Sequence, residues 1–294
     1  MNWLLARQRG WRIVLRIEDL DGPRIKRGAD SQAIEDLRWL GIDWDEGPLY
    51  QSTRFDRYRA AIDLLTEKKL AYPCVCSRRE VESAASAPHA EDGASIYPGT
   101  CREKFESIGD ARRAGGREPA IRLAVPDETI EFDDEFAGRR RFDAARQLGD
   151  FVIAKADGTP AYQLAVVVDD SAMSVTHVVR GDDLLDSTPR QILLYRALGM
   201  ADRIPRYTHL PLVIGEDGRR LAKRHGDTRL SHYRQLGVPP SRALELLARW
   251  CWMPTSNAMT ASDLVPRFQL DAVPKDPIVF TAADDAFLRG GIAR

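Results

Sequence analysis

The sequence predicts an α/β protein in which helices cover a mainly parallel sheet. Short apolar runs rich in β-branched residues alternate with amphipathic stretches of helical period. Three of the predicted strands end in clusters of charged residues, near positions 18, 180 and 220. A Rossmann-type sheet brings the carboxyl ends of its strands to one crevice, so these charges are expected to form one polar site.

The first forty residues predict a helix, a strand and a second helix. Residues 1–10 have the pattern of the last turns of an amphipathic helix, which Gly10 ends. A strand is predicted over 11–17 and a helix over 29–40. Glu18 stands where the strand ends, and its carboxylate could hold an ammonium group. Acidic strand ends also serve as solvated helix caps, and this reading stays open.

Three of the four cysteines lie within 28 positions, in a chain without a secretion signal. Cys74, Cys76 and Cys101 therefore favour a metal or a redox site over disulfides, and three thiolates suit tetrahedral zinc. The fourth donor could be the phenolate of Tyr97 or the imidazole of His89. On ligand chemistry alone His89 is the better candidate. Ordinary packed cysteines remain the alternative.

A third region combines an apolar run with a basic strand end. Residues 161–170 predict a buried helix or strand, and residues 175–179 predict a β-branched strand that ends at Arg180. A helix should follow with Pro189 as its first residue and Leu198 near its end. The Arg180 guanidinium could form a two-pronged pair with a carboxylate, although a solvated arginine is an equal alternative.

The most basic loop follows the apolar run 210–214, which predicts one buried strand. A glycine-containing turn at 215–219 leads into Arg-Leu-Ala-Lys-Arg at 220–224, three cations in five positions. Such cations can stabilise the charge that develops on transferring phosphates. A solvated basic turn is the other explanation.

Composition sets limits on the class of protein. The 294 residues include 44% apolar and 30% charged residues, with a net charge of −1, which suits an enzyme of two or more domains. This charge neither requires nor excludes a nucleic-acid partner. No apolar run reaches 18 residues, so we expect a cytoplasmic monomer without a membrane partner.

Four segments together resemble a known family. Residues 17–21, 162–170, 177–181 and 220–224 are similar, in order and spacing, to class I glutamyl-tRNA synthetases, and the last resembles their second signature loop. The cysteine set, Val166 and the short C-terminal part are similar more narrowly to the glutamyl-Q tRNA(Asp) synthetases. These transfer glutamate to queuosine in the anticodon of tRNA(Asp).

The resemblance implies a class I catalytic domain of Rossmann type with ATP, Mg²⁺ and glutamate as ligands. Glu18 would bind the α-ammonium group of glutamate, Arg180 its side-chain carboxylate, and Tyr162 would complete the pocket. Lys223 would be the catalytic residue, stabilising the ATP phosphates. The rest of the ATP loop would be formed by Arg220, Leu221, Ala222 and Arg224.

The resemblance further implies one structural zinc ion held by Cys74, Cys76, Tyr97 and Cys101, which favours Tyr97 over His89. It also divides the chain into four parts. These are the first half of the catalytic domain (1–70), a zinc-bearing insertion (71–145), the second half with the signature loop (146–228) and a short helical region that contacts the tRNA stem (229–294).

The family's domain starts with a strand and a histidine-containing first signature, and residues 1–10 resemble the end of the helix that follows it. We therefore expect coding sequence upstream of Met1. Without that signature, adenylate formation should fall by about 10²–10³-fold for each lost contact. Two alternatives remain: a glutamyl-tRNA synthetase that charges 3′ ends, and an inactive paralogue that only binds tRNA. A zinc-dependent RNA-binding module would leave the four substrate residues unexplained.

Overall fold

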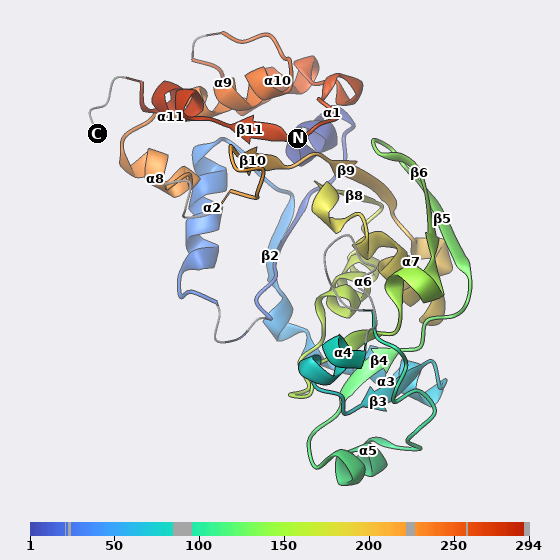
Figure 1. Ribbon diagram of the computed structural model, residues 1–294. Helices are drawn as coiled ribbons and strands as arrows, with labels where there is room; N and C mark the ends of the chain where they lie inside the picture. The colour runs from blue at the N-terminus through green and yellow to red at the C-terminus, as the bar shows by residue number, and fades with distance from the viewer. Residues whose placement is uncertain (21, 23–24, 85–95, 222–226, 257, 291–294) are drawn as a thin grey trace. The chain divides into compact units, whose positions relative to one another are not determined.

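The computed structural model describes residues 1–294 except 21, 23–24, 85–95, 222–226, 257 and 291–294 (Figure 1). The chain divides into two units, each described here by itself. Unit 1 contains Met1–Tyr50, Val179–Asp183 and His209–Arg294, and unit 2 contains Gln51–Val178 and Leu184–Thr208. In the described part of the chain, no helix combines the length and the apolar character that crossing a membrane requires.

Helices and strands follow one another in mixed order along the chain. The helices are α1 (Asn2–Gln8), α2 (Ala29–Trp39), α3 (Phe55–Glu67), α4 (Arg78–Ala84), α5 (Ile108–Gly115), α6 (Tyr162–Ala172), α7 (Ser187–Ala197), α8 (Leu230–Gln235), α9 (Pro240–Trp250), α10 (Ala261–Leu264) and α11 (Ala282–Arg289). The strands are β1 (Val14–Ile17), β2 (Glu46–Tyr50), β3 (Ala71–Cys74), β4 (Ala120–Leu123), β5 (Thr129–Asp134), β6 (Gly138–Asp143), β7 (Phe151–Ala154), β8 (His177–Gly181), β9 (Arg206–Leu210), β10 (Val213–Gly215) and β11 (Ile278–Phe280). Short helical turns complete the list: η2 (Gln51–Thr53), η3 (Ala144–Leu148), η4 (Asp182–Leu184), η5 (Ala201–Arg203), η7 (Val265–Arg267) and η8 (Leu270–Ala272).

The α/β class is confirmed, and the described strands form parallel, antiparallel and mixed sheets. The described strands form two parallel pairs, β1–β2 and β10–β11, an antiparallel sheet β3–β4–β7, and a mixed sheet β6–β5–β9–β8. In the mixed sheet, β5 is antiparallel to β6 and parallel to β9. Antiparallel strands need only a short turn between them, which is why residues 120–154 can add strands without crossover helices.

Two predicted strands differ from the structure. The run 210–214 is divided, because β9 ends at Leu210 and β10 starts at Val213. Pro211 stands between them, and proline has no N–H to donate to a ladder. The strand predicted over 11–17 starts only at Val14, since the Ile13 N–H donates to the Asp45 carboxylate at 2.7 Å.

The two helices after residue 160 are nearly as predicted. Residues 162–170 of the segment that could be helix or strand belong to α6, in which Leu164, Ala165, Val166 and Val167 are buried. The valine run 166–168 adopts a helix because burial outweighs the weak helix preference of β-branched residues. Helix α7 starts at Ser187, so Pro189 is its third residue, not its first as predicted.

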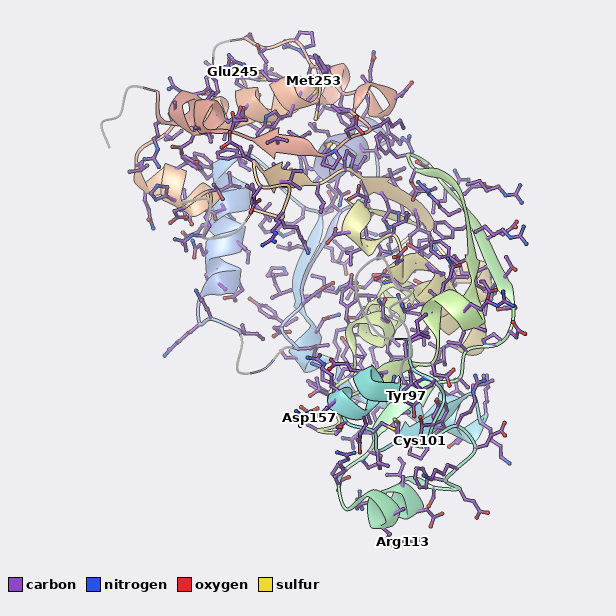
Figure 2. The ribbon with its side chains drawn as sticks, viewed as in Figure 1. Tyr97, Cys101, Arg113, Asp157, Glu245 and Met253 are labelled. Atoms are coloured by element: carbon purple, nitrogen blue, oxygen red, sulfur yellow. The ribbon has the colours of Figure 1, made fainter. Side chains whose placement is uncertain are left out.

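The core of unit 2 lies between these helices, α3 and the nearby strands. Its buried side chains include Leu65 of α3, Ile121 of β4, Ile153 of β7, Leu164 of α6 and Leu194 of α7. A smaller buried cluster joins the end of β3 to the loop that carries Tyr97 and Cys101, both labelled in Figure 2.

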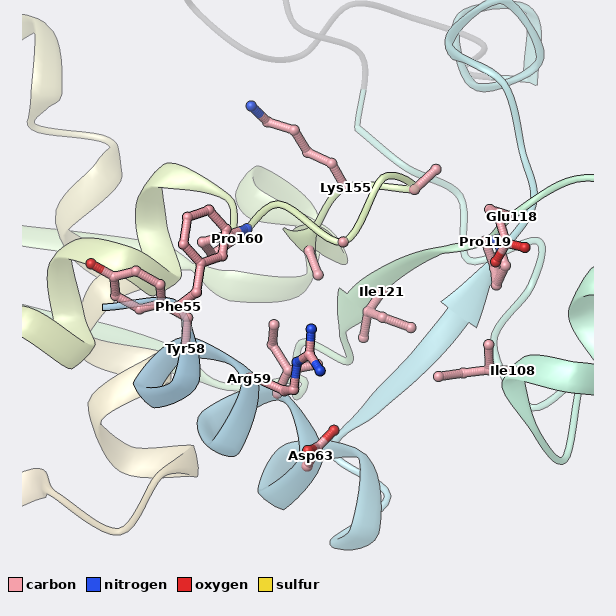
Figure 3. A pocket seen from close by; sticks show the side chains of 14 residues that line it. Phe55, Tyr58, Arg59, Asp63, Ile108, Glu118, Pro119, Ile121, Lys155 and Pro160 are labelled. Carbon is pink, nitrogen blue, oxygen red and sulfur yellow. The ribbon is translucent and has the colours of Figure 1, made fainter. Parts of the chain in front are cut away.

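Unit 2 also contains a pocket of about 250 Å³ beside α3 (Figure 3). Phe55 and Arg59 line it from the helix, Ile121 from β4, and Lys155 and Pro160 from the turn after β7. Its wall is apolar and its rim carries charges of both signs.

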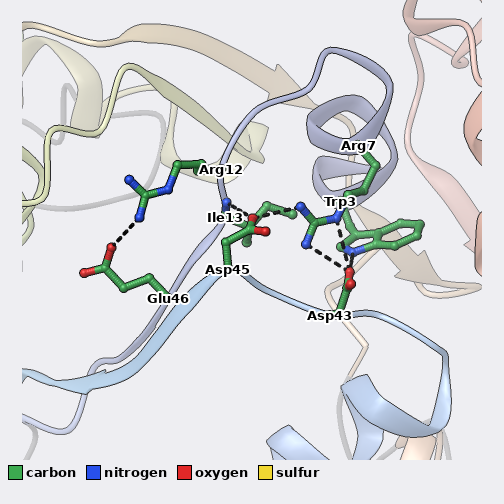
Figure 4. A network of polar contacts seen from close by, with 7 residues as sticks. All are labelled: Trp3, Arg7, Arg12, Ile13, Asp43, Asp45 and Glu46. Atoms are coloured by element: carbon green, nitrogen blue, oxygen red, sulfur yellow. Dashed lines mark hydrogen bonds and ion pairs between the residues drawn. The ribbon is translucent and has the colours of Figure 1, made fainter.

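In unit 1, an ionic network fixes α1 against the segment before β2 (Figure 4). Arg7 contacts Asp43 at 3.0 Å and Asp45 at 2.8 Å, and the Trp3 indole donates to Asp43 at 2.7 Å. The indole hydrogen bond and then Arg7 hold the pKa of Asp43 below its usual range. Gly10 has φ +66° just after the helix, so the predicted end of α1 is confirmed.

The C-terminal part of unit 1 is mainly helical, as predicted. The helices predicted over 230–252 are interrupted at the proline pair, and Pro240 is the first residue of α9. Helix α8 contacts α2 through Arg234, whose Nη1 lies 2.9 Å from the Glu35 carboxylate. The sequence did not predict β11, which pairs in parallel with β10.

Candidate active site and metal site

The acidic end of β1 carries the first predicted substrate residue. Glu18 follows the strand directly, and its Oε1 accepts a hydrogen bond from Arg16 Nη2 at 3.0 Å. The Arg16 side chain is 16% exposed and the Glu18 side chain 43%. The carboxylate is therefore oriented by a fixed cation and still accessible from solution, as an ammonium-binding group must be.

Arg180 lies one residue before the end of β8 and is anchored within unit 1. Its Nε donates to His209 Nε2 on β9 at 2.9 Å. At the next residue, Gly181, a Cβ would lie 2.5 Å from Asp183 Oδ1 and 2.7 Å from Leu212 Cδ2, so a side chain there would displace one or both of these side chains.

The cationic loop begins with the turn predicted from its glycines. Gly218 has φ +72°, its N–H donates to the Gly215 carbonyl at 3.0 Å, and Ile214 bridges to Arg220 across the turn. The Arg220 guanidinium forms an ion pair with Asp183 at 3.0 Å. Two predicted sites, the end of β8 and the start of the basic loop, therefore lie side by side.

Other predicted residues of this site cannot be placed with them. Leu221 is half-buried, while Ala222, Lys223 and Arg224 lie outside the described residues. Tyr162 is the first residue of α6, 41% exposed, and belongs to unit 2. Its approach to Glu18 and Arg180 stays a prediction.

In unit 2, the predicted metal ligands do come together. Tyr97 Oη lies 3.4 Å from the sulfurs of both Cys74 and Cys76, and the Cys76 and Cys101 sulfurs are 3.5 Å apart. The three sulfurs all lie within 4.8 Å of one another. His89, the other candidate, is outside the described residues.

These distances fit a small tetrahedral ion. Zinc–sulfur bonds of about 2.3 Å place two thiolates of a tetrahedral site roughly 3.8 Å apart. Three thiolates with one oxygen donor are also the kind of ligand set that zinc accepts. The four groups could therefore hold a metal ion.

Burial and a nearby cation set the electrostatics of this cluster. Burial raises the pKa of the Tyr97 phenol, and it raises the pKa of Cys76 to about 11. For Cys74 burial is outweighed by the hydrogen bond with Tyr97 and by Arg122, so its pKa is lowered. The Arg122 guanidinium lies over the Tyr97 ring, 3.9 Å from its centre.

One glycine makes the position of Tyr97 possible. Gly149 has φ +58°, and a Cβ at this position would lie 2.6 Å from the Ile96 side chain and 3.4 Å from the Tyr97 backbone. Any other residue would displace the loop that carries the phenol.

Sequence reasoning missed two buried carboxylates of unit 2. Asp169 is fully buried on α6 and accepts hydrogen bonds from Gln51 Nε2, Arg54 Nε and Tyr58 Oη at 2.9, 2.6 and 2.7 Å. Asp150 accepts from Tyr72, from Arg102 at 2.9 Å and from the Val125 N–H at 2.7 Å. The signal for Asp169 was its place at the end of a buried apolar run. None of the predicted site residues that the structure describes lines the pocket beside α3.

Comparison with known proteins identifies the family. The family described as "tRNA synthetases class I (E and Q), catalytic domain" matches residues 1–284. The chain belongs to this family. It is 47% identical over 303 residues to the glutamyl-Q tRNA(Asp) synthetase of Symbiobacterium thermophilum, covering 100% of this chain and 93% of that protein.

Two other proteins that this chain resembles are longer than it. Glutamate–tRNA ligase of Geobacter sulfurreducens is 40% identical over 281 residues, covering 95% of this chain and 58% of the ligase. The crystal structure of a glutamate-tRNA synthetase from Elizabethkingia anophelis matches with a TM-score of 0.80 and 26% identity, covering 98% of this chain and 65% of that one. The chain thus spans less than two thirds of the length of these two proteins.

Proposed function

We propose that this protein activates glutamate with ATP and transfers it to queuosine in tRNA(Asp). The observation that carries the proposal is that Asp183, three residues after Arg180, pairs with Arg220 at the start of the cationic loop, in a chain of the class I family. This arrangement would set a carboxylate-binding group next to a phosphate-binding loop, which would suit the two substrates of an adenylation reaction.

Glutamate would bind at the ends of β1 and β8. The Glu18 carboxylate would accept the α-ammonium group, and Arg180 would form a bidentate contact with the side-chain carboxylate. Tyr162 would complete this pocket from the first turn of α6. Glutamine lacks the negative charge that Arg180 would bind, so it would be rejected.

ATP would bind at residues 220–224 together with Mg²⁺. The α-carboxylate of glutamate would attack the α-phosphorus, form a glutamyl-adenylate and release pyrophosphate. Lys223 and its basic neighbours would stabilise the charge on the phosphates, so the rate gain would come from positioning and electrostatics.

In the second step a hydroxyl group of queuosine would attack the activated carboxyl group and release AMP. The higher identity with the Symbiobacterium relative, 47% against 40% for the Geobacter ligase, supports this acceptor over a 3′-terminal ribose. Residues 229–294 would contact the tRNA stem. Charging of 3′ ends is the second candidate, supported by the same fold.

The zinc ion would be structural and would stabilise the insertion 71–145. Its ligands would be Cys74, Cys76, Tyr97 and Cys101, whose mutual distances fit a tetrahedral site. Bound there, it would hold the end of β3 against the loop 96–101.

The test follows the label from glutamate into tRNA. Two versions are assayed with ATP, labelled glutamate and tRNA(Asp) with or without queuosine: residues 1–294, and the same chain preceded by any in-frame codons upstream of Met1. Mass spectrometry of the nucleosides should detect glutamyl-queuosine from at least one version. Label on the 3′-terminal adenosine would favour the second candidate, and no label from either version would favour a binding protein without catalysis.

A further inference from the structure

His209 occupies a buried position in β9, next to the predicted substrate site. Its side chain is 1% exposed, like the neighbouring Thr208 at 2% and Leu210 at 5%. A buried imidazole is stable when its ring nitrogens are hydrogen-bonded. The hydrogen bond from Arg180 therefore satisfies one ring nitrogen of His209 and also restrains the arginine side chain.

The 2.9 Å contact between Arg180 Nε and His209 Nε2 fixes the direction of this hydrogen bond. An arginine side chain has only donors, so His209 Nε2 accepts. The imidazole therefore serves as an acceptor that carries no negative charge.

The same contact fixes the plane of the guanidinium. Arginine has a long flexible side chain, and a bidentate contact with a carboxylate requires one defined orientation of its planar fork. The contact holds Arg180 through Nε, the nitrogen closest to its stem. It thus orients the two terminal nitrogens that a carboxylate ligand would meet.

An acceptor without negative charge suits a residue that is to bind an anion. Two carboxylates follow in the chain, and Asp183 pairs with Arg220 at 3.0 Å. Burial, and then the charge of Asp183, raise the pKa of Asp182. An aspartate in place of His209 would add a negative charge beside the guanidinium, whereas an imidazole acceptor orients the guanidinium without adding one.

We propose that His209 is a positioning residue for Arg180, and that it sets the preference for glutamate over glutamine. The proposal rests on the proposed function, in which Arg180 binds the side-chain carboxylate. His209 touches no substrate in it and acts through Arg180.

The test compares three substitutions at position 209. Gln carries an amide oxygen at about the distance of Nε2 from the backbone, Asn reaches only to the position of Nδ1, and Ala has no acceptor. Glutamate affinity is measured by calorimetry, and KM and kcat for glutamate, glutamine and ATP by tRNA glutamylation. Thr208→Val, a buried polar change on the same strand, is the matched control. Thermal melts show that each variant is folded.

We expect H209A and H209N to raise KM for glutamate about tenfold, the effect of a lost hydrogen bond to a charged group. The preference for glutamate over glutamine should fall by a similar factor, while kcat and the KM for ATP change less than about twofold. H209Q and T208V should stay near the wild-type values. If H209A does not fold, the proposal is tested by comparing the KM for glutamate and the preference over glutamine between H209Q and H209N.

A double variant separates positioning from a general structural effect. In an Arg180→Ala background, His209→Ala should cause no further loss of glutamate affinity, because the residue through which it acts is gone. Additive losses, or an H209N enzyme with wild-type selectivity, would overturn the positioning role alone. A wild-type protein that binds no glutamate and glutamylates no tRNA would overturn the proposed function and this role together.

Discussion

The two units differ in how deeply they bury certain charged groups. In unit 2, Asp169 and Asp150 are almost completely buried and each accepts three hydrogen bonds from neighbouring groups. In unit 1, the Glu18 side chain is 43% exposed and forms an ion pair with Arg16, and the Arg220 side chain is 72% exposed and forms one with Asp183. Buried and satisfied carboxylates hold a structure together, whereas accessible charges at strand ends can exchange their partner for a ligand. Substitutions in unit 2 should therefore affect stability, and those in unit 1 activity.

The largest expected effect is that of Asp169→Ala on stability. This change removes a carboxylate that three donors share and leaves the Arg54 guanidinium inside unit 2 without its ion pair. We expect the free energy of unfolding to fall by about 3–5 kcal/mol, measured by urea denaturation. Asp63→Ala, an exposed change on α3, is the control and should cost less than about 0.5 kcal/mol. Equal losses in the two variants would contradict the contrast between the units.

The second-largest expected effect is a loss of catalytic activity without a loss of stability. Lys223→Ala should reduce adenylate formation by about 10²–10³-fold, since it removes a cation that would stabilise the phosphates in the transition state. Pyrophosphate exchange measures the step, in the version of the chain that glutamylates tRNA. The melting temperature should not change. Lys275→Ala, another lysine of unit 1, should keep full activity, and a large loss there would mean that the effect is not specific to the loop.

A third experiment tests the ligand set in unit 2. Tyr97→Phe removes the phenol oxygen that lies 3.4 Å from two sulfurs, so zinc affinity should fall by at least about 10- to 100-fold in competition with a chromophoric chelator. Tyr72→Phe is the matched control, because that hydroxyl donates to Asp150. Unchanged affinity in the Tyr97 variant would exclude the phenol as ligand, and His89→Ala would then be tested.

The smallest effect should appear at an exposed ion pair of unit 1. Arg229 Nε donates to Asp227 at 2.7 Å, and this pairing lowers the pKa of Asp227 to about 2. The lowered pKa means that the pair stabilises the fold above the unfolded pKa near 3.8 and that this contribution is lost as the pH falls towards 2. In Arg229→Ala, carboxyl NMR should show the pKa of Asp227 return towards 3.8. A pKa that stays near 2 would assign the shift to other neighbours.

Local sequence signals predicted the local structure well. Gly10 marks the end of α1, Pro240 the start of α9, and the glycines of the 215–219 turn its position, because each of these residues restricts or permits the backbone by itself. The spacing of Cys74, Cys76 and Cys101 indicated that these thiols lie together, and the structure shows that they do. The choice of Tyr97 over His89 came from the family resemblance and stays a prediction.

Long-range pairing could not be predicted from the same signals. Ile278 of β11 pairs with Val213 of β10, 65 positions earlier, and nothing in either segment specifies its partner strand. His209 sits in a strand with apolar neighbours, where its role depends on Arg180 arriving from β8. A sequence shows which side chains can form such contacts, but the contact itself depends on how distant strands align.

The hydrogen bonds to Asp169 join side chains that the ribosome makes at different times. Tyr58 precedes its acceptor by 111 positions and Arg54 by 115. At about 5–20 residues per second, the ribosome needs roughly 6–22 s to reach the aspartate after making the tyrosine. During that time the whole cysteine-bearing segment emerges, while the carboxylate that will join α3 to α6 does not yet exist. The three cysteines and Tyr97 can therefore come together first, on a unit whose core is still open.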